Sequence, residues 1–331
     1  MHHIKINELA KQIVEKIIEN KDYYNAEVHR LDNGSIVIDM SKASWNGGKL
    51  VGEICMGGLG SVEFSSYNLD GHFIPSVNVY TSEPIISCMA SQLAGWNVKL
   101  KKEVEKNGQI NKKVIFQSLG SGPARAKGKV EKIFDELDYS DNSECAVIVF
   151  ETPKSPNEEV MDIIATKCGV DPTETYAVFA PTACLVGSIQ VAARIVETGI
   201  HKLHEIKFPI DLINDGFGTA TIAPIGKDDL GAMGRTNDSI SAVGLTYYNI
   251  SLEKDREGEI FELIKKAPAN TSPSYGKPFL ETFKTANYNF YDIDPGLFAP
   301  AVYTITNSLT GNCVTVGKVN NELLKQSYGL K

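Results

Sequence analysis

Residues 180–205, APTACLVGSIQVAARIVETGIHKLHE, form the stretch around which the rest of the chain is predicted to be organised. Pro181 and Thr182 suit the start of a helix, since proline is tolerated in a first turn and threonine can cap it. Between residues 185 and 196 almost every side chain is apolar or small, which is typical of a helix buried on most of its circumference. The pattern predicts one buried helix that ends at Gly199.

Three polar side chains interrupt this helix at Gln190, Arg194 and Glu197, and their spacing stacks them along one face. A guanidinium and a carboxylate on a buried helix need a partner, water or a ligand, because desolvating either one alone is costly. In a last helical turn, the dipole raises the pKa of Glu197 while Arg194 lowers it. Such a carboxylate suits proton transfer, and a buried structural ion pair at a domain or subunit seam explains the pattern equally well.

The composition is that of a globular protein, with 331 residues, 42% of them hydrophobic and 22% charged. This length predicts two domains, each large enough for its own core. We expect the α/β (mixed α+β) class, with two mixed α/β domains. The predicted boundaries place residues 1–100 and 270–331 in the first domain, and residues 101–269, with the central helix, in the second.

Charge, hydropathy and cysteine usage exclude several function classes. The formal net charge of -8, without a long basic block, argues against a nucleic-acid partner and is compatible with a small cationic substrate. The apolar runs are too short to cross a membrane and the N-terminus lacks a signal-peptide core, so we expect a cytoplasmic protein. The six cysteines form no CxxC pair, and His201 and His204 lack a third ligand at a clear spacing, so we predict no metal site.

Strand-like and helical segments alternate along the chain. A strand at 145–151, a helix at 158–168 and a strand at 176–180 predict a parallel crossover. Residues 28–56 are predicted to form a hairpin, because Asn46-Gly47-Gly48 separates two apolar runs. In the strand predicted at 73–81, Pro75 indicates a sheet edge.

Two further segments are predicted to be irregular and solvated. Residues 101–113, KKEVEKNGQINKK, are charged and carry a turn, which indicates a hairpin or loop. Residues 227–240 hold Asp228, Asp229, Asp238 and Arg235, a density of charge that a solvated loop explains better than a metal site does.

A glycine loop follows the strand predicted at 114–119. Its sequence, GSGPARAKGK (120–129), could cradle a phosphate between backbone N–H groups and basic side chains. It satisfies neither nucleotide-binding fingerprint, and a tight turn is the alternative. The predicted anion-binding residues are Gly120, Ser121, Gly122, Arg125 and Lys127.

Five segments carry a resemblance to a known family: GSGPARA (120–126), APTACLVGSIQVAARIVETGIHKL (180–203), KDDLGAMGRTND (227–238), GKPFLETF (276–283) and IDPGLFAPA (293–301). In this order they are similar to archaeal methenyltetrahydromethanopterin cyclohydrolases. The resemblance implies reversible hydrolysis of the cationic methenyl bridge of a pterin coenzyme to its 5-formyl form, in the one-carbon metabolism of methanogenesis. It also implies a homotrimer whose two α/β-type domains lie side by side and enclose a pocket. No prosthetic group is implied, the coenzyme being the substrate.

The family's catalytic arginine and glutamate, three apart in ARxxE, match Arg194 and Glu197. We predict that two further residues bind the substrate, together with the residues of the glycine loop. They are Gln190, on the same helix face, and Arg235, in the KDDLGAMGRTND segment. Cys184 stands where a small serine or alanine is expected, a difference that we expect to affect packing rather than chemistry.

Two other functions compete with this one. Another one-carbon pterin enzyme, such as a formyltransferase, would use the same pocket but needs a second site for a formyl donor. A non-enzymatic trimer that binds a phosphate or nucleotide would use the 120–129 loop. Ultraviolet absorbance separates hydrolysis from binding, because the methenyl pterin bleaches only when it is hydrolysed.

Overall fold

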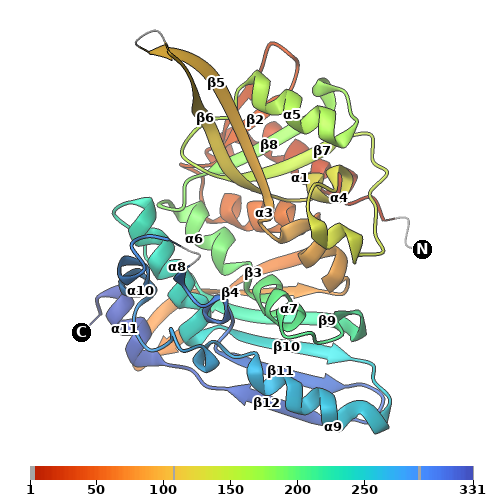
Figure 1. Cartoon of the computed structure of the whole chain (residues 1–331), viewed down its shortest axis with the longest axis vertical. Helices are drawn as coiled ribbons and strands as arrows, with labels where there is room; N and C mark the ends of the chain where they lie inside the picture. The colour runs from red at the N-terminus through yellow and green to blue at the C-terminus, as the bar shows by residue number, and fades with distance from the viewer. Residues whose placement is uncertain (1–3, 107–108, 290–291, 331) are drawn as a thin grey trace. The chain divides into compact units, whose positions relative to one another are not determined.

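Two six-stranded sheets make up the core of the computed structural model, which describes residues 4–106, 109–289 and 292–330. The strand orders are β1-β2-β8-β7-β6-β5 and β12-β11-β10-β9-β4-β3. Each sheet contains both parallel and antiparallel pairs of strands, and helices alternate with strands along the chain (Figure 1). The predicted mixed α/β class is confirmed.

The contacts within the chain divide it into two compact units. The first is Met1–Gly58 with Ala90–Pro181, and the second is Leu59–Met89 with Thr182–Lys331. This division differs from the predicted boundaries, 1–100 with 270–331 and 101–269. Strand pairing is the reason, because β4 (His72–Thr81) joins β9 (Ile213–Thr221) of the second unit.

The first unit is built on the sheet that begins with β1. Its strands are β1 (Glu27–Arg30), β2 (Ile36–Asp39), β5 (Trp96–Lys106), β6 (Gln109–Ser121), β7 (Ala146–Glu151) and β8 (Thr175–Ala180). Its helices are α1 (Ile6–Glu19), α2 (Lys21–Tyr24), α3 (Trp45–Cys55), α4 (Ala124–Gly128) and α5 (Glu158–Cys168). Strands β7 and β8 pair in parallel through α5, so the predicted crossover is confirmed.

The hairpin predicted over residues 28–56 is wrong in its second half. Strands β1 and β2 do pair as a hairpin, but the residues that follow form helix α3. Its buried residues Leu50, Val51, Ile54 and Cys55 recur at helical spacing. Gly47 does not make a turn: a Cβ there would lie 2.7 Å from the Ala43 Cβ, so its absent side chain permits close packing.

Strands β5 and β6 pair along a long two-stranded ribbon (Figure 1). This confirms a hairpin over residues 101–113. The turn predicted within that segment falls at residues 107 and 108, which lie outside the described residues.

The second unit combines the other sheet with six α-helices in the described part of the chain. Its strands are β3 (Gly60–Leu69), β4, β9, β10 (Leu245–Ile250), β11 (Val302–Asn307) and β12 (Cys313–Gly317). Its helices are α6 (Leu185–Ala192), α7 (Ile195–Glu205), α8 (Asp229–Val243), α9 (Lys254–Leu263), α10 (Phe279–Thr285) and α11 (Asn321–Tyr328). None of the described helices in either unit is long and apolar enough to cross a membrane.

Two predictions for this unit are wrong. Strand β4 lies between β3 and β9 rather than at an edge, and its pairing with β9 begins at Ser76, one residue after Pro75. The segment predicted as a solvated loop is mostly helix α8, capped by Asp228, whose Oδ1 accepts a hydrogen bond of 2.8 Å from the Gly231 N–H. Within this helix Gly234 is a packing glycine, since a Cβ there would lie 2.9 Å from the Leu280 Cβ.

One face of the second sheet carries a row of exposed aromatic side chains. Tyr80 of β4 pairs with Phe217 of β9, which in turn pairs with Tyr247 of β10. Their exposed fractions are 46%, 41% and 38%. Directly opposed residues share a face of a sheet, so the three rings form a continuous apolar row.

Helix α7 packs closely on the opposite face of this sheet, through glycines on both elements. A Cβ at Gly216 would lie 2.6 Å from Val196 Cγ1, and one at Gly199 would collide with the Tyr248 hydroxyl. That hydroxyl is fully buried and donates a 2.8 Å hydrogen bond to the Val196 carbonyl. The position of α7 therefore depends on glycine, which has no side chain, at positions 199 and 216.

The Gly199→Ala substitution is expected to destabilise the protein by roughly 1–3 kcal/mol, the usual cost of overpacking. Gly258→Ala in α9 is the control, because no atom lies within 4 Å of its Cβ position; alanine should be neutral there or add up to about 1 kcal/mol. Thermal unfolding compares the two. Adding Tyr248→Phe to Gly199→Ala should recover part of the loss, and equal melting temperatures for the two single variants would contradict this account.

Candidate active site

The central stretch forms two helices rather than the single helix that its pattern predicts. Helix α6 ends at Ala192 and α7 begins at Ile195. Between them the Arg194 N–H donates to the Val191 carbonyl at 3.0 Å, an i to i+3 bond that tightens the turn. Helix α7 then runs through Gly199 to Glu205, so the predicted stop at Gly199 is also wrong.

This break changes the electrostatics at Glu197. The carboxylate lies in the first turn of α7, not in the last turn of a longer helix. A helix N-terminus carries partial positive charge and stabilises an anion. The helix dipole therefore acts on Glu197 with the opposite sign from the predicted one, and it favours the ionised form as Arg194 does.

The polar face predicted from the sequence is buried within the second unit. The exposed fractions of Gln190, Arg194 and Glu197 are 4%, 9% and 5%. Arg194 donates from its Nε to the Gln190 Oε1 at 3.2 Å, which fixes the plane of the guanidinium. Two oppositely charged groups thus stand one helical turn apart inside the fold.

Cys88 is a neighbour of this pair that the sequence analysis missed. Burial raises the pKa of its thiol to about 12, and the charge of Glu197 acts in the same direction. Its Sγ lies 3.6 Å from the Ser87 hydroxyl, which in turn lies 2.9 Å from the Thr81 hydroxyl. No motif marks Cys88, because its proximity to Glu197 arises from the long-range pairing of β4 with β9.

The entry to α6 also differs from expectation. Cys184, not Thr182, is the N-cap, and its Sγ accepts a hydrogen bond from the Gly187 N–H at 3.2 Å. The preceding Ala183 N–H donates to Asp229 Oδ1 at 2.8 Å, which ties this entry to the first turn of α8. The thiol thus performs the capping role that a serine hydroxyl would serve.

The glycine loop lies in the first unit and uses its polar groups internally. Gly122 adopts a φ of 95°, which favours glycine, and its N–H donates to the Ser91 carbonyl at 2.9 Å. Ser121 Oγ donates to the Gln92 carbonyl at 2.8 Å, and the adjoining Gly120 is buried. These contacts support the tight-turn alternative for the loop.

Arg125 is fully buried, with an exposed fraction of 0%. Its guanidinium donates to Glu131 at 2.5 Å from Nη2 and 2.9 Å from Nε, and to the Ser91 carbonyl at 3.1 Å. We therefore assign Arg125 to the folding of the loop rather than to a ligand. Lys127 is half-buried and keeps some exposed surface.

Arg235 lies in the second unit, on α8, at a pocket of about 390 Å³ formed with residues of α10 and α11. Its Nη1 donates to the Ile225 carbonyl at 3.2 Å and to that of Pro224 at 3.4 Å. No group of three or more histidine, cysteine, aspartate or glutamate side chains suited to a metal occurs among the described residues.

Comparison with known proteins places this site in a family. A sequence profile described as Cyclohydrolase (MCH) matches residues 5–328. A methenyltetrahydromethanopterin cyclohydrolase of Methanocaldococcus jannaschii is 42% identical over 333 residues, covering 98% of both chains. One of Methanosarcina barkeri is 36% identical over 332 residues, covering 99% of both. The chain belongs to the methenyltetrahydromethanopterin cyclohydrolase family.

Asp238 is a second buried acid in this member of the cyclohydrolase family. It lies on α8 with an exposed fraction of 2%, and its carboxylate accepts from the Phe279 N–H at 2.9 Å. Burial raises its pKa to about 7, and the nearby Glu281 adds to the rise. The carboxyl group therefore links α8 to the start of α10 and titrates near neutral pH.

The folded state holds the Asp238 proton more tightly than the unfolded chain does, so stability should fall as the pH rises from about 4 to about 7. Asparagine keeps an acceptor for Phe279 but cannot ionise. We expect the stability of Asp238→Asn relative to wild type to increase from pH 5 to pH 8, by at most about 3 kcal/mol. Melting temperatures measured across this range test the expectation, with Asp255→Asn on exposed α9 as control. Parallel curves for wild type and Asp238→Asn would show that Asp238 does not titrate there.

Proposed function

We propose that this protein hydrolyses the methenyl bridge of a methenyltetrahydromethanopterin cation to the 5-formyl form, reversibly, in the one-carbon metabolism of methanogenesis. The relatives are named for this activity. The observation that carries the proposal is the buried Arg194 and Glu197 pair, which matches the ARxxE of the family residue by residue. We further propose that the enzyme is cytoplasmic and that the pterin coenzyme is its substrate rather than a bound cofactor.

The chemistry requires little besides a positioned base. The methenyl carbon belongs to an amidinium-like cation and is already electrophilic, so no metal is needed to polarise it. A water oxygen adds to that carbon while Glu197 accepts one of its protons. Glu197 then returns a proton to the departing ring nitrogen as the carbon–nitrogen bond breaks, which leaves the formyl group on the other nitrogen and one proton released.

The geometry suits this sequence of steps. The N-terminus of α7 and the Arg194 guanidinium supply positive charge on the side of the Glu197 carboxylate, which counteracts the cost of burying it. Gln190 holds the guanidinium plane, and a planar group orients a carboxylate better than an ammonium does. The carboxylate also favours a cationic substrate over the neutral product.

The competing functions have less support. A formyltransferase needs a second site for a formyl donor, whereas the relatives are named for cyclohydrolase activity. The non-enzymatic alternative depended on phosphate binding by the glycine loop, whose arginine is fully buried against Glu131.

Replacing Glu197 with glutamine should leave folding and coenzyme binding intact and lower turnover by roughly 10²–10⁴-fold, the usual contribution of general acid–base catalysis. Bleaching of the methenyl absorbance measures turnover, and the melting temperature of the same sample reports folding. Arg194→Lys should also be slow, because an ammonium cannot reproduce the planar donor pair.

Two outcomes of this assay contradict the mechanism. A stable Glu197→Gln variant with full turnover would remove the catalytic assignment. Loss of wild-type activity after exhaustive chelation, restored by one specific metal, would show that the reaction does depend on a metal.

We also propose a homotrimer. The row of Tyr80, Phe217 and Tyr247 supports an interface between copies, since aromatic residues are enriched at such surfaces. Light scattering at micromolar concentration should give a mass three times the 36.1 kDa of the chain. A stable monomer would refute the assembly without affecting the assignment of Glu197.

A further inference from the structure

The pocket at Arg235 is a built cavity outside the catalytic pair. It has a volume of about 390 Å³ and lies where α8, α10 and α11 gather in the second unit (Figure 1). Its lining includes three cationic side chains, Lys227, Arg235 and Lys284, and two carboxylates, Asp228 and Glu281. The charges from the loop before α8, from α8 itself and from α10 therefore converge on one space.

One of the two carboxylates is engaged in the fold. Asp228 Oδ1 caps α8 through the Gly231 N–H at 2.8 Å, so hydrogen bonding to the helix offsets part of its charge. Glu281 is exposed on α10. The three cations thus outnumber the carboxylates, and one of the carboxylates already accepts from the backbone.

The walls of the pocket are held in place by the backbone. Arg235 is anchored to the carbonyls of Pro224 and Ile225, which fixes its position on the pocket wall. Gly226 packs against the backbone of Ala232 so closely that no Cβ would fit there. Gly231 and Gly234 line the pocket from α8, and the missing side chain of Gly234 lets Leu280 of α10 approach, since a Cβ there would lie 2.9 Å from the Leu280 Cβ.

We propose that this pocket binds an anionic group of a small molecule, a phosphate or a carboxylate. Lys227 and Lys284 supply point charges, and Arg235 supplies a planar donor of the kind that recognises oxyanions. The side chain of Gln326 adds a neutral hydrogen-bond donor from α11, whereas the Ser327 hydroxyl is engaged with the Asp238 carboxylate.

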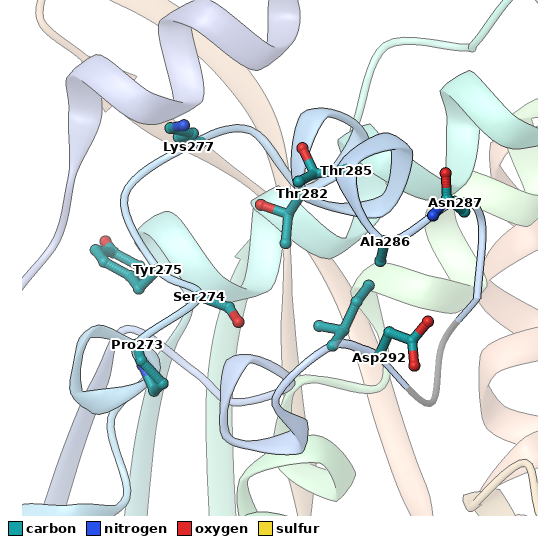
Figure 2. A pocket seen from close by; sticks show the side chains of 10 residues that line it. Pro273, Ser274, Tyr275, Lys277, Thr282, Thr285, Ala286, Asn287 and Asp292 are labelled. Carbon is teal, nitrogen blue, oxygen red and sulfur yellow. The ribbon is translucent and has the colours of Figure 1, made fainter.

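A neighbouring pocket of similar volume shows what distinguishes this one. It is lined by hydroxyl and amide side chains, with Lys277 and Asp292 at opposite ends (Figure 2). One cation and one carboxylate give that pocket no net charge, so it has no preference for an anion. Lys277 therefore provides a matched control.

The pocket is connected to the catalytic pair through α6. Asp229, next to Asp228 in the pocket wall, holds the Ala183 N–H at the start of α6, and Arg194 follows its end. An eight-residue helix is about 12 Å long. The anion can therefore be a distal group of the substrate itself, an assignment that rests on the proposed function, or a separate molecule.

Inorganic phosphate is the probe for binding. Calorimetric titration at constant ionic strength should show that wild type binds phosphate and that Lys227→Gln with Lys284→Gln binds roughly 100-fold more weakly, about tenfold for each lysine. Glu281→Gln should bind several-fold more tightly, because it removes a like charge, and Lys277→Gln should match wild type. Absence of phosphate binding in wild type, or equal losses in Lys277→Gln and the double variant, would overturn the proposal.

Kinetics then distinguish the source of the anion. Phosphate that competes with the complete methenyl substrate, but not with a methenyl pterin lacking its tail, identifies the site with the substrate's own anionic group. Phosphate that binds without competing against either identifies a separate ligand. The Glu197→Gln variant should bind phosphate as tightly as wild type does. Turnover therefore tests the catalytic assignment, and phosphate binding tests this pocket independently of it.

Discussion

The close approach of α7 to the second sheet is the constraint on which the candidate site depends. Glycines at 199 and 216 remove the side chains that would hold helix and sheet apart, and Tyr248 bonds to the carbonyl of Val196 beside Glu197. Backbone packing therefore fixes the first turn of α7, which carries Glu197. This packing positions in advance the residue that we propose as the base.

Periodic segments could be predicted from the sequence, and glycine-containing ones could not. The amphipathic α1 and the β7–α5–β8 crossover follow from their patterns alone. Gly47 suggested a turn and Gly199 a helix end, yet each lies within a helix and packs closely against neighbouring residues. The absence of a Cβ permits both a tight turn and close packing, so only the neighbouring residues in the fold show which of the two a glycine provides.

The same limit applies to the site. The apolar neighbours of Gln190, Arg194 and Glu197 along the chain predicted their burial correctly. The break that puts Glu197 in a first turn is not marked by that apolar pattern, and Arg125 is buried against Glu131, six residues away, and the distant Ser91 carbonyl. A basic residue in a glycine loop gives no sign of whether it faces solvent or an internal carboxylate.

The discontinuous division of the chain has a consequence for synthesis on the ribosome. Strand β4 emerges at residue 81, whereas its partner β9 begins at residue 213. At translation rates of about 5–20 residues per second, the β3–β4 hairpin waits roughly 7–26 s for that partner. During this interval its inner edge, with Val77 and Val79, has no strand to pair with, which exposes the nascent chain to wrong pairings. The segment from residue 59 to residue 89 is thus one part of the protein that a chaperone would protect during synthesis.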